Sequence, residues 1–499
     1  MNVKTRFPPS PTGFLHVGSL RTALYNYLFA KKHGGTFLVR VEDTDRERLV
    51  EGAVESLIRT LETVGITYDE GPILVDGKLS EKGTNGPYTQ SHRLPIYKAH
   101  AQKLVEQGSA YYCFCSKDRL EELRNQQQIA KLQTKYDRQC VKLDPEEISR
   151  RLAAGESHVI RLQIPDGETT FQDEIRGPIT ISNSEIDDQV LMKVDGYPTY
   201  HLAVVVDDHL MGVTHIIRGE EWISSVPKHV VLYNAFGFPM PSFAHLPLIL
   251  NADKSKLSKR QGDVAVEGYL AKGYLPEALV NFVALLGFNP TGDREIYTVE
   301  ELVEAFELSK VNKSGAVFDR TKLDWMNGQY IRSVDSERLF VLAQPYFGDA
   351  STLPDEQKKK ILEVEKERLV TLMELEERVK MYLALTEYPA TDLVWKSGLK
   401  AGSGSAGKAD AQDALLHLTN LAKLLESAES AVFEKRELIE EVIKTYIGEN
   451  GYQNGNVLWP LRVALSGQTQ SSGPFDLLWV LGTQEGRARL LIAIDKLTS

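Results

Sequence analysis

Two short segments carry side chains suited to holding a nucleoside triphosphate. The first runs from Thr5 to Ser19 as Thr-Arg-Phe-Pro-Pro-Ser-Pro-Thr-Gly-Phe-Leu-His-Val-Gly-Ser, and the second is Lys-Leu-Ser-Lys-Arg at positions 256–260. The first predicts a strand, a proline-stiffened loop and the start of a helix that holds His16 and Gly18, where backbone N–H groups and the helix dipole favour an anion. Two ammonium groups on the second segment could close over the phosphates and stabilise departing pyrophosphate.

Each segment also has an ordinary structural interpretation. His16 could cap a helix beside a packing glycine, and residues 256–260 could form a solvated basic turn, as most charged runs do. In the binding interpretation, Gly18 lets a nucleotide approach the backbone and His16 donates to a phosphate oxygen. A His-x-Gly triplet arises often by chance, so its position after a strand and a proline loop is what favours binding.

The elements around the first segment predict an α/β unit. Val3 to Phe7 alternates apolar and polar residues, helical spacing follows from Leu20 to Leu28, and Thr36 to Val41 predicts a second strand. Gly34-Gly35 is expected to end the helix. A strand–helix–strand order predicts a parallel pair, and ligands collect at the carboxyl ends of such strands, where Glu42 also lies.

Two later apolar runs predict more of the same sheet. Residues 201–206 resemble a buried strand, and residues 215–218 resemble another that ends at Gly219-Glu220-Glu221-Trp222. The simplest interpretation is one sheet interrupted by a large insertion. Residues 336–499 show helical periods and almost no strand alternation, and the Gly/Ser-rich residues 400–407 predict a surface loop.

Length and composition favour a globular chain of several domains. A chain of 499 residues has room for about three to five domains. No apolar run approaches the length of a bilayer span and no signal peptide precedes the first strand, so a cytoplasmic location is expected. The net charge of −11 argues against a general polyanion binder, although local basic strips still allow a nucleic-acid partner. Three cysteines suit a reducing compartment.

Five motifs in a fixed order resemble those of glutamyl-tRNA synthetases. They are Phe-Pro-Pro-Ser-Pro-Thr-Gly-x-Leu-His-x-Gly at 7–18, Val-Glu-Asp-Thr-Asp at 41–45, Gly-Tyr-Pro-Thr-Tyr-His-Leu-Ala at 196–203, Arg-Gly-Glu-Glu-Trp at 218–222 and Lys-Leu-Ser-Lys-Arg at 256–260. The likeness continues through Trp459 to Gly467 near the end of the chain. By these motifs the chain is identified as a bacterial-type member of this class I aminoacyl-tRNA synthetase family.

The resemblance implies an α/β fold with a class I Rossmann-type catalytic domain, an inserted domain and C-terminal all-α domains. The implied domains are a split catalytic domain at 1–95 and 200–251, an inserted acceptor-stem-binding domain at 96–199, a stem-contact region at 252–335, and two helical anticodon-binding domains at 336–385 and 386–499.

The family's reaction has two steps. Glutamate attacks ATP to give glutamyl-adenylate and pyrophosphate, and the 3′-terminal ribose of tRNA(Glu) then takes the glutamyl group and releases AMP. His16 and Lys259 match catalytic positions of the family's two signature motifs, and with Lys256 and Gly18 they would stabilise the phosphorus centre by electrostatics. Glu221 and Ile249 are expected to hold the ribose and adenine of ATP, and Mg²⁺ would accompany the triphosphate.

A substrate with two carboxylates and an ammonium group needs both signs of charge in one pocket. The resemblance implies a glutamate pocket of six residues: Arg6, Ser10, Glu42, Tyr200, Arg218 and Trp222. The arginines would bind carboxylates through guanidinium forks, and Glu42 would hold the ammonium. The alternatives are that an arginine only solvates a sheet edge and that Tyr200 belongs to the core. Val204 stands where some relatives carry asparagine, so one polar contact is expected to be absent.

Two further sites rest on the resemblance. Cys113-x-Cys115 followed by Tyr136-x₃-Cys140 resembles a zinc knuckle of some family members, and a zinc ion there would be structural. The first spacing is tight and tyrosine is an uncommon ligand, so three unligated thiols remain the alternative. Arg368 falls on the family's Arg-x-x-Thr-Leu pattern and is expected to reach an anticodon base. It could equally be one more solvated charge.

Other functions remain as rivals. A glutaminyl-tRNA synthetase typically reads Pro-Glu-Pro-Asn-Gly in the first loop, against Pro-Ser-Pro-Thr-Gly here, and carries β-barrels where this chain is predicted helical. An inactive paralogue that only binds RNA is disfavoured by the intact His16, Lys256 and Lys259. A paralogue that modifies a tRNA base is disfavoured because the anticodon-binding region is present. Charging of tRNA(Gln) stays open, and a monomer is expected from the family.

Overall fold

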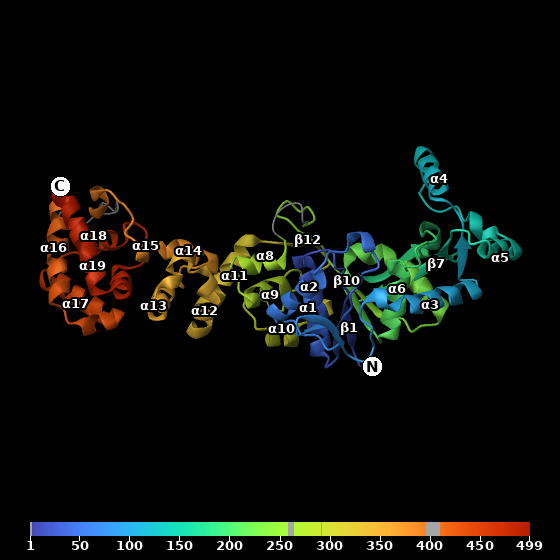
Figure 1. Cartoon of the computed structure of the whole chain (residues 1–499), viewed down its shortest axis with the longest axis horizontal. Coiled ribbons are helices and arrows are strands. Elements are labelled where there is room, and N and C mark those ends of the chain that lie inside the picture. Colours follow the sequence, from blue (N-terminus) through green and yellow to red (C-terminus); the bar gives the residue numbers. More distant parts are fainter. Residues whose placement is uncertain (1, 258–263, 291, 396–409) are drawn as a thin grey trace. The chain divides into compact units, whose positions relative to one another are not determined.

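The computed structural model describes residues 2–257, 264–290, 292–395 and 410–499 (Figure 1). Lys259, Arg260 and the predicted loop at 400–407 therefore lie outside the described residues. Contacts divide the chain into two compact units, treated separately below: Met1–Ala271 with Pro276–Leu323, and Lys272–Leu275 with Asp324–Ser499. Of the helices described, none is both long and apolar enough to cross a lipid bilayer.

A parallel strand pair opens the first unit. β1 (Lys4–Phe7) pairs with β2 (Thr36–Val39), and α1 (Val17–Lys32) connects them and packs on both (Figure 1). This confirms the predicted strand–helix–strand unit. Three consecutive residues of β1, Thr5 to Phe7, are buried, and α1 ends where His33 and Gly34 leave the helical conformation, since Gly34 adopts a positive φ of 59°.

A second parallel pair lies beside the first. β10 (His215–Gly219) pairs with β11 (Ser242–Leu246), and α7 (Val226–Phe236) lies between them in the chain. The Lys4 carbonyl accepts a hydrogen bond of 2.9 Å from the Thr214 N–H, which brings the start of β10 to the start of β1. The carboxyl ends of β1, β2 and β10 therefore reach one edge, as expected for a ligand site in an α/β sheet.

The predicted strand at 201–206 is wrong, because these residues belong to a helix. α6 spans Tyr200–Leu210, and its residues from Leu202 to Asp208 are all buried. A run that is apolar on every side loses the periodicity that separates a helix from a strand, and the three valines bias the interpretation towards a strand. Asp207 and Asp208 thus lie on a buried helix rather than beyond a strand end.

The segment predicted as an insertion is partly built into the sheet. β5 (Ala110–Cys113), β6 (Val159–Leu162) and β9 (Val190–Met192) form an antiparallel sheet of their own. β7 (Glu168–Asp173) and β8 (Gly177–Ser182) form a hairpin, and Asp173 pairs with Phe243 of β11. The hairpin therefore extends the β10–β11 pair and brings Asp173 close to the strand that carries Arg218.

Other elements of the first unit surround this framework. They are α2 (Ala53–Thr63), β3 (Gly71–Val75), β4 (Lys78–Lys82), α3 (Leu94–Glu106), α4 (Lys117–Ile129), α5 (Pro145–Ala153), β12 (Ile249–Leu250), α8 (Val266–Ala271), α9 (Pro276–Ala284), α10 (Val299–Ala305) and β13 (Ala316–Val317). α11 (Arg320–Ser333) runs from the first unit into the second.

The second unit is helical throughout its described residues, as predicted. Its helices are α12 (Ser336–Ala343), α13 (Asp355–Glu365), α14 (Leu375–Arg378), α15 (Lys380–Leu383), α16 (Ala411–Ser427), α17 (Arg436–Glu449), α18 (Asn454–Ser466) and α19 (Pro474–Thr498). α16, α17 and α18 pack against α19 (Figure 1). Arg489 of α19 is buried and donates to the carbonyls of Met381 and Leu465 at 2.6 and 2.7 Å, which ties the bundle to the helix before it.

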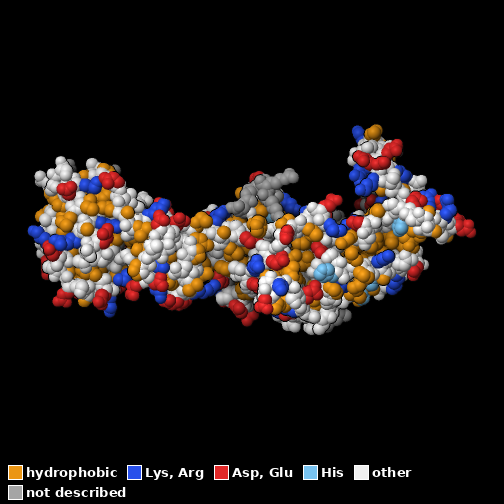
Figure 2. All heavy atoms as spheres, in the orientation of Figure 1, with side chains coloured by type: hydrophobic (Ala, Val, Ile, Leu, Met, Phe, Trp, Pro, Cys, Tyr) orange, Lys and Arg blue, Asp and Glu red, His pale blue; other side chains and the backbone are white. Residues whose placement is uncertain are grey.

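Charged side chains are mixed on both units. Figure 2 shows lysine and arginine interspersed with aspartate and glutamate over the visible face of each unit. The net charge of −11 is thus spread rather than gathered on that face.

Candidate active site

One pocket of about 610 Å³ collects every described residue that the sequence assigned to the reaction centre. The predicted residues on its lining are Arg6, Ser10, His16, Gly18, Glu42, Tyr200, Arg218, Glu221, Trp222, Ile249 and Lys256. Only Lys259 of that set lies outside the described residues. The pocket is formed at the carboxyl ends of β1, β2 and β10 and at the start of α1, where an α/β fold is expected to bind a ligand.

Arg6 is fully buried, and two of its three guanidinium nitrogens have no hydrogen-bond partner. Its Nε lies 3.3 and 3.2 Å from the two carboxylate oxygens of Asp208, whereas Nη1 and Nη2 are buried without a hydrogen-bond partner. Unpaired buried donors cost free energy unless a ligand accepts from them. A guanidinium fork that is held at Nε and has two unbonded outer nitrogens suits bidentate binding of a carboxylate.

Arg218 forms a second cationic wall. Its Nη1 donates to the Tyr200 hydroxyl at 2.7 Å, and its Nε donates to Nε2 of His245 at 3.2 Å. The rings of Tyr200 and Trp222 pack with centroids 4.4 Å apart and form an aromatic wall beside Arg218. Tyr200 is only partly buried and lines the pocket, which places its hydroxyl at the site and not wholly in the core.

Glu42 supplies the opposite charge. It is 8% exposed, and its Oε1 accepts from Nη2 of Arg40 at 2.9 Å. Burial raises the pKa of the Glu42 carboxyl, and the Arg40 guanidinium opposes that rise. A substrate ammonium beside Glu42 would add a second favourable charge in a site with little water.

A buried network that the sequence reasoning missed links Arg6 to Glu42. Asp208 accepts from Nε of Arg6 and from Nη1 of Arg40 at 2.7 Å, and Arg40 holds Glu42. Next to it, Asp207 accepts from Nε of Arg93 at 2.7 Å. The signal that could have revealed this network is the Asp207-Asp208 pair, because carboxylates at the end of an apolar run need cationic partners when buried.

His16 has the capping role that was the alternative to phosphate binding. It is the N-cap of α1, and its Nδ1 accepts from the Gly18 N–H at 2.9 Å. An accepting Nδ1 places the proton of a neutral imidazole on Nε2, which makes that nitrogen a donor. A Cβ on residue 18 would lie 3.1 Å from this Nδ1, so glycine keeps the helix start open. Capping and phosphate binding are therefore compatible here.

The chain on either side of residues 258–263 is fixed to the pocket wall. The Leu257 N–H donates to the Ile249 carbonyl at 2.9 Å. On the other side, the Val17 N–H donates to the Val264 carbonyl at 2.9 Å. Both ends of the stretch that contains Lys259 are thus hydrogen-bonded to residues at the pocket, one of them at the start of α1.

The four residues of the predicted zinc knuckle come together. The sulfurs of Cys113, Cys115 and Cys140 all lie within 4.8 Å of one another, and Cys115 and Cys140 are 3.5 Å apart. The Tyr136 hydroxyl lies 3.4 and 3.3 Å from the sulfurs of Cys113 and Cys115. Tetrahedral zinc with Zn–S bonds of about 2.3 Å separates its ligands by about 3.8 Å, so this donor set fits.

Two other residues named from the sequence, Arg368 and Val204, do not line the pocket. Arg368 is exposed in the second unit, and its backbone carbonyl accepts from Nη2 of Arg378 at 3.2 Å. Its contact with an anticodon base stays a prediction. Val204 is buried in the core of the first unit and does not line the pocket.

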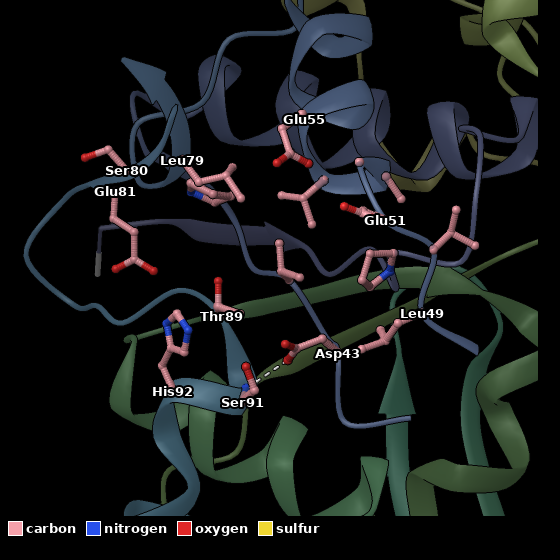
Figure 3. Close-up of a pocket in the computed structure, with 17 residues that line it drawn as sticks. Asp43, Leu49, Glu51, Glu55, Leu79, Ser80, Glu81, Thr89, Ser91 and His92 are labelled. Atoms are coloured by element: carbon pink, nitrogen blue, oxygen red, sulfur yellow. Dashed lines mark hydrogen bonds between the residues drawn. The ribbon is translucent and has the colours of Figure 1, made fainter. Parts of the chain in front are cut away.

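A second pocket of about 600 Å³ is acidic, whereas the first pocket contains arginines (Figure 3). Figure 3 shows four carboxylates around it, from Asp43, Glu51, Glu55 and Glu81, with His92 at its edge. Lysine and arginine are absent from its described lining. Repulsion by these carboxylates disfavours a triphosphate there, in contrast to the pocket of Arg6 and Arg218.

Comparisons with known proteins give matches over most or all of the chain. Residues 2–325 match the family described as tRNA synthetases class I (E and Q), catalytic domain, and residues 338–494 match an anticodon binding domain. A glutamate–tRNA ligase of Clostridium botulinum is 46% identical over 497 residues, covering 99% of this chain and 98% of that protein. One from Clostridioides difficile is 52% identical over 391 residues, or 77% and 79% of the two chains. A crystal structure of a glutamate tRNA ligase from Elizabethkingia meningosepticum, in complex with its amino acid, is 34% identical with a TM-score of 0.87 and 99% coverage of both chains.

Proposed function

We propose, from the premise that the chain belongs to the family of class I tRNA synthetases for glutamate and glutamine, that the pocket of Arg6, Glu42 and Arg218 activates L-glutamate. The chain is an ATP-dependent glutamate–tRNA ligase, since it shares 46% identity with such ligases over nearly its whole length. It joins glutamate to the 3′-terminal ribose of tRNA(Glu) and releases AMP and pyrophosphate.

The observation that carries this assignment is the pair of outer guanidinium nitrogens of Arg6, Nη1 and Nη2, which have no hydrogen-bond partner. Its two outer nitrogens are buried at the pocket, Arg218 provides a second fork, and Glu42 stands opposite in charge. Glutamate carries two carboxylates and one ammonium, which matches these groups in number and sign. Glutamine lacks the second negative charge and would leave one cation without a counter-charge.

The residues around the pocket support the first chemical step. An oxygen of the glutamate α-carboxylate forms a bond to the α-phosphorus while the bond to the β-phosphate oxygen breaks and pyrophosphate leaves. Nε2 of His16, the dipole of α1 and the ammonium of Lys259 stabilise the added negative charge. Mg²⁺ arrives with the triphosphate and neutralises part of its charge.

The second step consumes the adenylate. A terminal ribose hydroxyl attacks the glutamyl carbonyl, AMP leaves with the bonding electrons of the acyl–phosphate bond, and a phosphate oxygen of the departing AMP takes up the hydroxyl proton. Glu221 and Ile249 hold the ribose and adenine in this proposal, and both line the pocket. Residues 96–199 and 252–335 would contact the acceptor stem, and the domains at 336–385 and 386–499, with Arg368, would contact the anticodon. We also infer a monomer in the cytoplasm.

Aminoacylation of separate tRNA(Glu) and tRNA(Gln) transcripts tests the assignment. Each transcript is incubated with ATP and either glutamate or glutamine, and we expect glutamate on tRNA(Glu). Glutamate on both transcripts would identify the non-discriminating form of the enzyme. A preference for glutamine would contradict the assignment, and no charging at all would support the inactive RNA-binding module.

We also propose a structural zinc ion held by Cys113, Cys115, Cys140 and the Tyr136 hydroxyl, whose geometry fits tetrahedral coordination. Purified protein is expected to contain about one zinc per chain by elemental analysis, and Cys140→Ser is expected to lose the metal and melt at a lower temperature. Tyr136→Phe keeps all three thiolates and should bind zinc more weakly without losing it. Wild-type protein free of zinc would favour the unligated thiols.

A further inference from the structure

Two buried residues that do not line the pocket stand behind Arg218. His245 on β11 and Asp173 on β7 are both 0% exposed. Nε2 of His245 lies 3.2 Å from Nε of Arg218, and Nδ1 lies 2.6 Å from Oδ2 of Asp173. The three side chains form a line from the β7–β8 hairpin, across β11, to the arginine on β10.

The direction of each hydrogen bond follows from the chemistry of the groups. Arg218 Nε–H can only donate, so Nε2 of His245 accepts and its Nδ1–H donates to Asp173. The other oxygen of Asp173 accepts from the N–H groups of Ile175 and Arg176 at 3.0 and 2.8 Å. Burial lowers the pKa of His245, which keeps Nε2 unprotonated although Asp173 opposes the shift. The hairpin turn therefore fixes the carboxylate, which fixes the imidazole, which fixes the guanidinium.

The two arginines of the pocket are held in different ways. Nε of Arg6 is paired directly with a carboxylate, that of Asp208. Nε of Arg218 instead meets a neutral imidazole, and the carboxylate of Asp173 lies one residue further away. A neutral acceptor orients the plane of the guanidinium without pairing its charge, so more of that charge remains for a substrate carboxylate.

Ordering the Arg218 side chain costs conformational entropy. The bonds to His245 and Tyr200 impose that order before a substrate binds. A free arginine side chain loses rotamer entropy when it is ordered, and a preorganised fork loses less on binding. A shift of about 1 Å in such a group is enough to weaken binding and slow a reaction markedly. Arg218 is 4% exposed and already donates from Nε to His245, from Nη1 to Tyr200 and from Nη2 to the Trp222 carbonyl, which leaves one N–H on each Nη for the ligand.

We propose that Asp173 and His245 are positioning residues for glutamate, which set the guanidinium plane of Arg218 against one substrate carboxylate. The proposal rests on the proposed function. It makes glutamate affinity depend on a hairpin that comes from the segment between the two halves of the catalytic sheet. We expect no such dependence for ATP, because His245 bonds Arg218 and neither Glu221 nor Ile249, the residues assigned to the nucleotide.

Two substitutions at residue 245 separate orientation from folding. In His245→Asn, the amide nitrogen replaces Nδ1 and keeps the donor to Asp173, but the acceptor for Arg218 is lost. In His245→Gln, the amide oxygen replaces Nε2 and keeps that acceptor. We expect His245→Asn to raise the KM for glutamate by about 10- to 100-fold, the range for losing a hydrogen bond to a charged group. His245→Gln should recover part of this loss.

The measurement is aminoacylation of tRNA(Glu) by the full chain, with glutamate and ATP varied in turn. The KM for ATP is expected to change by less than about twofold, because the substitution removes a contact of Arg218 only. His215→Asn on β10, outside the pocket, is the matched control and should leave both constants unchanged. Asp173→Asn should give the same selective rise if His245→Asn fails to fold.

An unchanged KM for glutamate in the Asn variant would overturn the proposal. So would equal rises for glutamate and ATP together with a lower melting temperature, since that pattern marks a purely structural role. A wild-type protein that charges no glutamate onto tRNA(Glu) would overturn the proposed function itself, and the positioning role with it. The wild-type assay thus distinguishes the two failures.

Discussion

Arg6→Lys is expected to lower kcat/KM for glutamate by about 100-fold or more, because two charge-assisted hydrogen bonds worth about 1.5–3 kcal/mol each are lost. Arg6 presents Nη1 and Nη2 to the pocket while Nε bonds Asp208. A lysine has one ammonium and cannot hold Asp208 and grip a carboxylate with two parallel donors at once. Steady-state aminoacylation with varied glutamate measures the change.

The positive charge is kept in this variant, so the loss reports the geometry of the fork. Arg59→Lys on α2 is a matched control, since Arg59 is exposed and lies outside the pocket. The KM for ATP should stay within about twofold of the wild-type value, as the fork meets only the amino acid. Normal glutamate kinetics in Arg6→Lys would remove Arg6 from the site. An equal loss for ATP would assign it a general structural role.

Local pattern and family motifs together were sufficient to place the pocket. The alternation of Val3 to Phe7, the helical spacing after Leu20 and the glycines at 34–35 gave the parallel β1–β2 unit, because these signals act over a few residues. Motifs that begin or end at strand ends then converged, since parallel strands bring their carboxyl ends to one edge. Arg6, Glu42 and Arg218 met in one pocket for this reason.

The residues behind the pocket could not be predicted from local patterns or motifs. Asp173 reaches His245 only because β7 pairs with β11 at Phe243, and no spacing in the sequence encodes that register. The helix α6 was mistaken for a strand because burial on all sides hides its period. That error also hid Asp208, whose place on a buried helix lets one carboxylate serve both Arg6 and Arg40. Long-range charge pairing is thus the part that required a structure.

Lys259→Ala is expected to lower kcat by about 100- to 1000-fold, the range seen when one group that stabilises a transition-state charge is removed. The charge on the phosphates grows as pyrophosphate departs, so the lysine matters more in the transition state than in the ground state. Lys259 lies outside the described residues, yet its stretch of chain is anchored at Leu257 and Val264 beside the pocket. Single-turnover formation of glutamyl-tRNA measures the effect.

The affinity for tRNA distinguishes a transition-state role of Lys259 from attraction of its charge to tRNA phosphates. The dissociation constant of tRNA(Glu) should change by less than about twofold, because a single ammonium contributes little to a salt-dependent phosphate interface. Lys254→Ala is the control, since Lys254 is exposed and does not line the pocket. A variant that binds tRNA poorly but turns over normally at saturation would assign Lys259 to tRNA binding. The start of α1 and His16 would then carry the phosphate charge without it.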